Sequence, residues 1–295
     1  MNRLKFILKK SVAKQILHIS FTHITIILLL ILFSTNLLAQ SDLMIFPKRV
    51  VFEGNQKFQE LNLVNSGKDT ARYIVSFVQI KMKEDGGFEN ITKPDSGQQF
   101  ADNYLRIFPR NVVLAPSEAQ LLKIQLTKTN LLMPGEYRSH LYFRAEPDKK
   151  PFSIGDKTPL KDSSAISVQI KAIFGMTIPV IIRNGESTTQ VNLSKVSFVM
   201  LNDTLPTLKL IVNRTGNMSV YGDFKVEYIS PAGKITQVAI VQGFAVYTPN
   251  SLRRATLKLI KLPDIDYHSG KLHVVFLSQR EDKNTKLAEA DLQLQ

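Results

Sequence analysis

Residues 135–147 read Gly-Glu-Tyr-Arg-Ser-His-Leu-Tyr-Phe-Arg-Ala-Glu-Pro, and this stretch decides the fold class. From Tyr137 to Ala145, aromatic and apolar residues alternate with polar ones, which is the period of two that a β-strand produces. The turn sequence Met133–Pro134–Gly135 precedes this segment, and Pro147 follows it. We therefore predict a β-strand from Tyr137 to Ala145.

The same period extends over most of the chain, in segments separated by turn residues. We predict strands at residues 43–52, 58–64, 73–82, 105–114, 121–126, 137–145 and 165–180, and then at 196–201, 207–213, 223–229, 235–241, 246–247, 255–260, 271–278 and 287–294. Alternating strands with turn signals at this spacing are typical of a β-sandwich or barrel. No segment after residue 40 has a helical period over three turns.

The chain has 295 residues, which favours two domains. A polar segment rich in proline and lysine, Glu146–Ser164, is predicted to be a loop that precedes the strand ending near Arg183. Asn184–Gly185 then begins a second series of strands. The predicted fold is all-β, with two immunoglobulin-like β-sandwich domains in tandem, at residues 40–183 and 184–295.

The first 39 residues have the pattern of a secretory signal peptide. Residues 1–23 contain five Lys or Arg and no acid, and residues 24–39 are mostly apolar and end in Ala39. We predict export to the periplasm and cleavage after Ala39, which lowers the formal net charge from +13 to +8. An uncleaved anchor at residues 24–39 stays open, although this run is short for a spanning helix.

Composition excludes several classes of function. There is no cysteine, so disulfides, thiolate metal sites and lipid attachment at an N-terminal cysteine are ruled out. The basic residues after residue 39 are scattered and few aromatics lie among them, so we predict no nucleic-acid partner. We interpret the charge as a source of solubility and of attraction to acidic partners.

No catalytic motif is present. The sequence after residue 39 contains neither a phosphate-binding glycine loop nor a nucleophile elbow. His140, His268 and His273 lack metal-ligand spacing, and we expect each to be an exposed or hydrogen-bonded structural histidine. Asp264 and Asp266 are expected in a solvated turn. We predict a binding protein that is not an enzyme and has no metal and no cofactor.

The N-terminal half, from about Leu43 to Arg183, resembles the PapD-like periplasmic chaperones of the chaperone–usher pathway. The resemblance rests on four stretches in the family's order: Lys48–Gly54 (KRVVFEG), Leu61–Ser66 (LNLVNS), Pro109–Pro116 (PRNVVLAP) and Gly135–Pro147 (GEYRSHLYFRAEP). The fourth stretch is the most specific of them. The second half matches the family in architecture only.

The resemblance implies two sandwiches in a boomerang arrangement that bind pilus or fimbrial subunits and pass them to an outer-membrane usher. Such a chaperone donates a strand to a subunit that lacks one of its own. In this chain Ile166, Val168 and Ile170 alternate with polar residues and form the predicted donor strand. The alternative is that these three side chains face the protein's own core.

The resemblance also implies an anchor for the subunit's C-terminal carboxylate. Arg49 occupies the position of the family's arginine, although an ordinary surface arginine stays possible. The family's second basic residue is not at its expected position, where Phe174 stands instead of a lysine. The nearest basic residue, Lys171, is three positions earlier, on the opposite strand face. Either Lys171 completes the anchor or the second half of the anchor is missing.

Two other functions stay open at this stage. One is a structural or adhesive envelope protein that has the sandwiches but no client, and the other is an enzyme on a β scaffold. Self-association of the unliganded chain, which would cover an exposed strand, also stays open.

Overall fold

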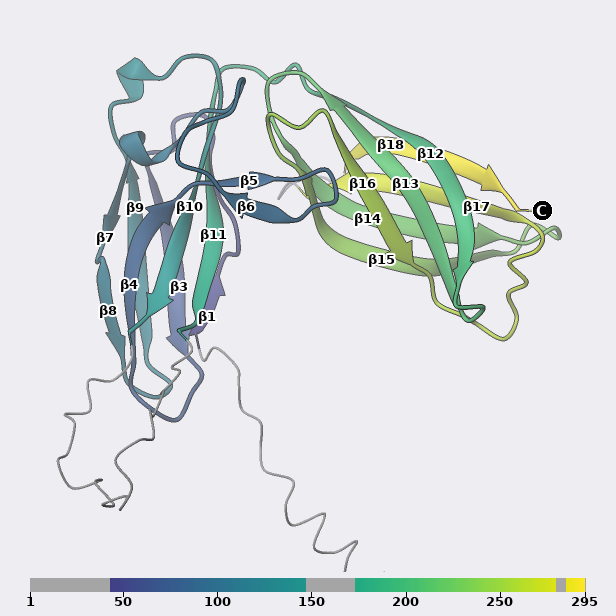
Figure 1. The fold of residues 1–295 in the computed structure, drawn as a ribbon, viewed down its shortest axis with the longest axis horizontal. Coiled ribbons are helices and arrows are strands. Elements are labelled where there is room, and N and C mark those ends of the chain that lie inside the picture. The colour runs from purple at the N-terminus through teal and green to yellow at the C-terminus, as the bar shows by residue number, and fades with distance from the viewer. Residues whose placement is uncertain (1–42, 147–172, 280–284, 295) are drawn as a thin grey trace, which may run out of the picture. The chain divides into compact units, whose positions relative to one another are not determined.

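In the computed structural model, residues 43–146, 173–279 and 285–294 are described, and residues 42–295 form one compact unit. Most of the described residues lie in strands, which pair into two β-sandwiches (Figure 1). The predicted all-β fold of two sandwiches is therefore confirmed. The predicted signal peptide and nearly all of the predicted loop at 146–164 lie outside the described residues. Within the described ranges, no helix has the length and hydropathy to span a bilayer.

The first sandwich consists of a four-stranded and a five-stranded sheet. The four-stranded sheet has the order β1 (Leu43–Phe46), β3 (Phe58–Asn65), β9 (Ala119–Leu126) and β7 (Leu105–Phe108). The five-stranded sheet has the order β2 (Val50–Phe52), β11 (Gly175–Asn184), β10 (Gly135–Ala145), β4 (Ala71–Val78) and β8 (Asn111–Leu114). All pairs are antiparallel except β2 with β11, which run parallel.

The core of the first sandwich follows the alternation in the sequence. On β3, Leu61 and Leu63 are fully buried while Glu60 and Asn62 are exposed. Leu141 and Phe143 on β10 belong to the same buried cluster. Burial of each such side chain contributes roughly 1.5–3 kcal/mol of hydrophobic free energy. The apolar face of each strand thus fixes which side of its sheet meets the other sheet.

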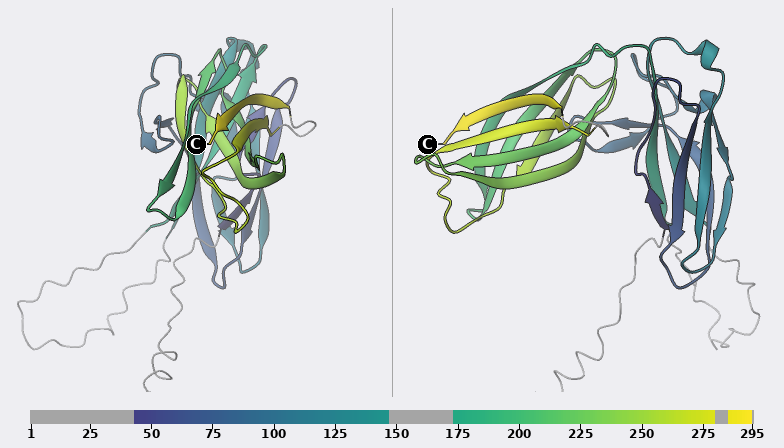
Figure 2. Two further views of the ribbon diagram at one scale, coloured as in Figure 1. Left: turned by 90° about the vertical axis from the view of Figure 1, so that its right-hand side faces the viewer. Right: turned by 180° about the vertical axis from the view of Figure 1, so that it is seen from behind.

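The second sandwich also has two layers (Figure 2). One sheet has the order β12 (Gln190–Leu201), β13 (Leu205–Thr215) and β16 (Leu252–Lys258), and the other has the order β15 (Ile235–Val246), β14 (Val220–Ile229), β17 (Lys271–Ser278) and β18 (Lys286–Gln293). Three rings form the centre of its core, where Phe224 stacks on Phe276 at 4.6 Å and Phe244 meets both edge-on. The predicted domain boundary falls at the last residues of β11 and stays a prediction.

Several predicted strands are divided or extended. The predicted strand 43–52 is two strands in different sheets, β1 and β2, and Pro47 lies between them. The predicted strand 105–114 divides in the same way around Pro109. A proline has no N–H to donate to a sheet, so each ladder stops there and the chain crosses to the other layer.

A short hairpin was not predicted. The strands β5 (Ile80–Met82) and β6 (Phe88–Asn90) pair across the Asp85–Gly86–Gly87 turn. The carbonyl of Met82 accepts a hydrogen bond from Nδ2 of Asn250 over 2.9 Å, so the hairpin contacts the second sandwich. Among the described residues, the helical segments are two 3₁₀ turns, η1 (Asp102–Tyr104) and η2 (Thr129–Leu131).

Candidate functional site

Of the predicted site residues, Arg49 is in the described part of the chain. The predicted donor residues Ile166, Val168 and Ile170, and the predicted anchor residue Lys171, lie outside it. Arg49 immediately precedes β2 and is half-buried. The sequence suggested that this arginine belongs to the first strand, whereas it lies in the segment that connects β1 to β2.

Arg49 packs against two aromatic rings of the second sandwich. Its guanidinium carbon lies 4.4 Å from the ring centroid of Tyr221 and 5.6 Å from that of Tyr247. Its Nη1 also donates a long hydrogen bond of 3.5 Å to the hydroxyl of Tyr247. A cation within about 6 Å of an aromatic face is attracted to it, so these rings hold the guanidinium in place.

A second arginine, which was not among the predicted site residues, lies against the Tyr247 ring. The guanidinium carbon of Arg138, on β10, is 4.2 Å from the ring centroid of Tyr247. Its Nη2 donates to the carbonyl of Thr248 over 3.2 Å, while Nε and Nη1 are buried and have no hydrogen-bond partner among the residues that the structure describes. Within residues 43–146, 173–279 and 285–294, neither Arg49 nor Arg138 forms an ion pair with a carboxylate.

Burial is the main reason why the pKa of Arg138 is lowered from its ordinary value, and the positive charge of Arg49 lowers it further. Tyr247 and Glu136 act in the opposite direction. A guanidinium retains its proton in proteins, so the site contains two positive charges that repel each other. The arrangement is thus electrostatically suited to an anion.

The nearest acid on the same strand, Glu136, is engaged elsewhere. Its carboxylate accepts hydrogen bonds from Nε of Arg183 at 3.2 Å, from the backbone N–H and hydroxyl of Ser219, and from the hydroxyl of Thr248 at 3.3 Å. Arg183 also forms an ion pair with Glu53 at 2.7 Å. These bonds join β10 and β11 to the second sandwich beside Arg49 and Arg138, which we call the arginine pair.

His140 is neither exposed nor hydrogen-bonded through its Nδ1, so our prediction for this residue was wrong. It is 3 % exposed, and its Nδ1 has no hydrogen-bond partner within the described ranges. The ring lies edge-on to Phe88 and Tyr247. Burial, together with the nearby cation of Arg138, lowers the pKa of His140 to about 3. By contrast, His268 and His273 bond to Asp266 and Asp291, as a structural role requires.

The strand that follows the predicted donor segment has an open edge. All of β11 pairs with β10 on one side, whereas on the other side only Val180–Ile182 pair, with β2. Residues 175–179 therefore have no partner strand on that side among the described residues. Pro179 lies in this open stretch, where a strand tolerates a proline. Just before the open stretch, the side chains of Ile173 and Phe174 are 51 % and 50 % exposed.

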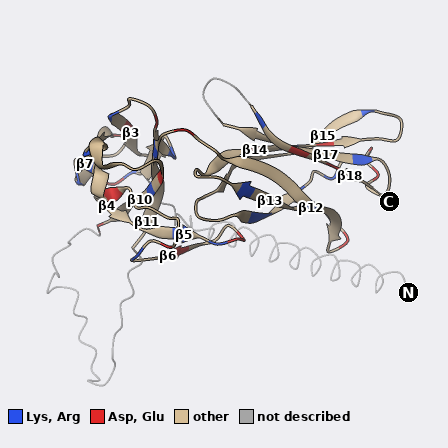
Figure 3. Cartoon of the chain, turned by 90° about the horizontal axis from the view of Figure 1, so that it is seen from above, with Lys and Arg blue, Asp and Glu red and all other residues tan. Residues whose placement is uncertain are grey.

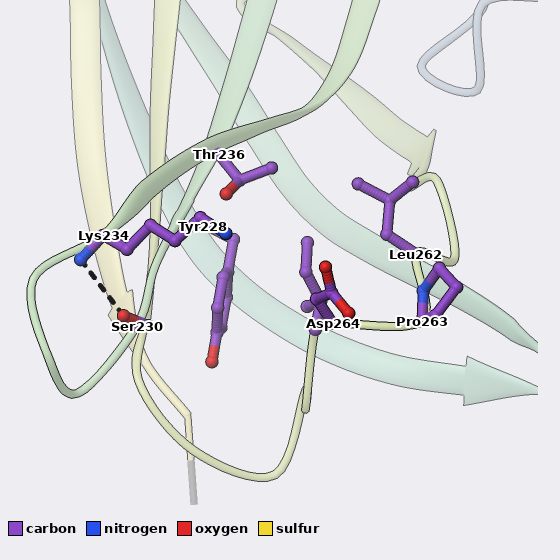
Figure 4. A pocket seen from close by; sticks show the side chains of 8 residues that line it. Tyr228, Ser230, Lys234, Thr236, Leu262, Pro263 and Asp264 are labelled. Carbon is purple, nitrogen blue, oxygen red and sulfur yellow. Dashed lines mark hydrogen bonds between the residues drawn. The ribbon is translucent and has the colours of Figure 1, made fainter.

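A small hollow and an acidic turn lie together in the second sandwich. A hollow of about 130 Å³ lies in the second sandwich between Tyr228, Thr236 and the Leu262–Ile265 turn (Figure 4). This volume is below the roughly 300–1,000 Å³ of typical ligand pockets. Asp264 lies exposed in this turn, as predicted. In the described ranges there is no group of three His, Asp or Glu residues that could hold a metal.

The charged residues are spread over both sandwiches, as the sequence indicated. In Figure 3 the blue Lys and Arg segments lie on strands of both sandwiches. Among the described residues, the positive charge is thus not confined to one of the two sandwiches.

Comparison with known families and curated proteins gives no match. Solved structures of similar fold include the YadV chaperone (13% identity, TM-score 0.41, covering 86% of this chain and 100% of that one) and the CupB2 chaperone of Pseudomonas aeruginosa (15%, 0.40, 85% and 100%). The chaperone DraB of E. coli is a third (14%, 0.38, 85% and 98%). Chaperones are thus among the proteins to which this chain is similar in fold. Likeness at this level does not bear on function.

Proposed function

We propose that this chain is a periplasmic chaperone that binds pilus or fimbrial subunits, stabilises them by donating a β-strand, and delivers them for assembly at an outer-membrane usher. The four stretches that resemble the PapD-like chaperones support this proposal. The observation that carries it is the edge of β11 at residues 175–179, which has no partner strand among the described residues, because the predicted donor residues 166–170 come shortly before it in the chain.

Strand donation has a simple physical basis. An open edge presents backbone N–H and C=O groups that an incoming strand can satisfy, and an uncovered edge is otherwise prone to aggregation. We expect the subunit to pair along residues 166–170 and to continue toward residue 179. The side chains of Ile166, Val168 and Ile170 would then fill apolar pockets of the subunit, which gives the interaction its specificity.

Arg49 is proposed as an anchor for the subunit's C-terminal carboxylate. Its guanidinium is held by two rings, makes no ion pair within the described residues, and is half-buried rather than sequestered. A planar guanidinium can bind both oxygens of a carboxylate and does not lose its charge. Residues 1–39 are proposed to direct export, after which the signal peptide is removed.

The experiment that tests this function is capture of a subunit in the periplasm. We expect the tagged chain to retain a subunit-like partner. Val168→Asp should abolish retention because it places a charge in an apolar pocket, whereas the matched control Gln169→Asp, on the opposite strand face, should retain the partner. If the wild-type chain retains nothing while its own subunit genes are expressed, the chaperone function is wrong, and a structural or adhesive envelope protein is favoured.

A further inference from the structure

The buried guanidinium of Arg138 requires an explanation that the fold does not provide. It is 2 % exposed, and two of its nitrogens have no hydrogen-bond partner in the described part of the chain. A buried N–H without a partner costs about 1–3 kcal/mol, and more when the group is charged. An apolar side chain of similar size would be more favourable at this position for folding alone. Buried polar groups of native proteins are rarely left without a partner, so these two nitrogens are candidates for hydrogen bonds to a ligand.

The surroundings of Arg138 indicate the chemistry of that partner. Arg49 lies against the same Tyr247 ring, and its charge lowers the pKa of Arg138, so the two cations are close enough to repel each other. Glu136, which lies two residues before Arg138, already accepts bonds from Arg183, Ser219 and Thr248. An added anion would satisfy the free N–H groups of Arg138 and reduce the repulsion between the two cations.

We propose that Arg49 and Arg138 together bind a carboxylate, the C-terminal carboxylate of the bound subunit, so that Arg138 supplies the second cation of the anchor in place of Lys171. This inference rests on the proposed function. The paired N–H groups of a guanidinium match the two oxygens of a carboxylate. Arg49 is half-buried and accessible to an incoming chain end, while Arg138 forms the buried side of the site.

The first test is nuclear magnetic resonance of the ¹⁵N-labelled chain purified from the periplasm. Sodium acetate is titrated against sodium chloride at constant ionic strength, with acetamide as the uncharged control of similar shape. We expect the Nε–H signal of Arg138 to shift saturably with acetate and not with acetamide. Arg49→Met should weaken this response roughly tenfold, since a charge-assisted hydrogen bond of this kind contributes at least that factor. The absence of an acetate-dependent shift at Arg138 overturns the inference.

A stability measurement separates a binding role from a structural role. The free chain with Arg138→Met should have an unchanged or raised melting temperature and should not respond to acetate. Arg144→Met, which removes an exposed arginine from the same strand, is the matched control and should keep the response. A large fall in melting temperature for Arg138→Met, together with no acetate response of Arg138 in the wild-type chain, means that Arg138 is structural and contradicts the inference. The wild-type titration remains decisive if that variant does not fold.

The outcomes distinguish this inference from the proposed function. If a subunit is captured but acetate leaves Arg138 unaffected, the function stands and the role of Arg138 is wrong. If acetate shifts Arg138 but no subunit is ever captured, the proposed function is wrong, and with it the assignment of the carboxylate to a subunit. Equal competition by inorganic phosphate would identify a general anion site and overturn the assignment to a carboxylate.

Discussion

Arg183 on β11 donates from Nε to the fully buried carboxylate of Glu136, its cross-strand partner on β10, over 3.2 Å. The carboxylate also accepts bonds from Ser219 and Thr248, and Arg183 reaches the carbonyl of Ser219 at 2.8 Å. Glu136 lies two residues before Arg138 on β10, so this ion pair fixes the position of the β10 backbone next to Arg138.

Glu136→Ala should strongly destabilise the protein. Removal of one partner leaves Arg183 and the N–H of Ser219 without their buried acceptor, and loss of one partner from a buried pair costs about 3–5 kcal/mol. The free energy of unfolding, measured in urea, tests this. The control Glu60→Ala removes an exposed ion pair with Lys123 at 3.7 Å, for which we expect a loss below about 1 kcal/mol. Equal losses in the two variants would contradict the account.

Asn65→Asp should be among the most damaging isosteric changes. The buried amide of Asn65 donates to the carbonyls of Asp69, Leu114 and Ala115 at 2.8, 3.0 and 3.1 Å. A carboxylate cannot donate, so near neutral pH we expect a loss of about 3 kcal/mol or more in unfolding free energy. The deficit should shrink at low pH, where protonation neutralises the group. Asn62→Asp, exposed on the same strand, should have little effect, and an equally large loss there would refute the explanation.

His140 should make the protein sensitive to acid. Its pKa of about 3 in the native state is below the ordinary value near 6.5, so between these values the unfolded chain binds a proton that the native chain does not. The contribution of His140 to stability is therefore intact above pH 6.5. It is lost as the pH falls toward 3, at about 1.4 kcal/mol per pH unit.

The measurement is urea unfolding from pH 7 to pH 4 for the wild-type chain and His140→Leu. The variant should lose less stability on acidification than the wild type, because its unfolded chain lacks that proton. The exposed His268→Gln serves as the control and should follow the wild type. Parallel pH profiles for the wild type and His140→Leu would exclude this role for His140.

Sequence was most informative where one strand face is buried. The strand predicted at 271–278 is observed with these bounds, and Leu61 and Leu63 face the core as their alternation indicated. Pairing between distant strands could not be predicted, because nothing local in Val50–Phe52 specifies that these residues pair in parallel with β11. The hairpin strand β6 was missed because all three of its residues are exposed and no alternation marks it.

The candidate site was predictable only in part. Arg49 was found through resemblance to a known family. Arg138 lies in the strand that decided the fold, but its significance comes from two unpartnered nitrogens and from Tyr247, which is far away in the sequence. The same holds for His140, whose unpartnered Nδ1 is a property of the packed structure. A missing partner leaves no local signal in the sequence.

Hydrogen exchange tests the central claim, strand donation, most directly. The rate of amide exchange for residues 166–178 would be compared between the free chain and the chain bound to its captured subunit. We predict slower exchange at alternate residues along this segment in the complex, because alternate N–H groups of an edge strand point toward an added strand. A stable complex in which the exchange of these residues is unchanged would contradict strand donation.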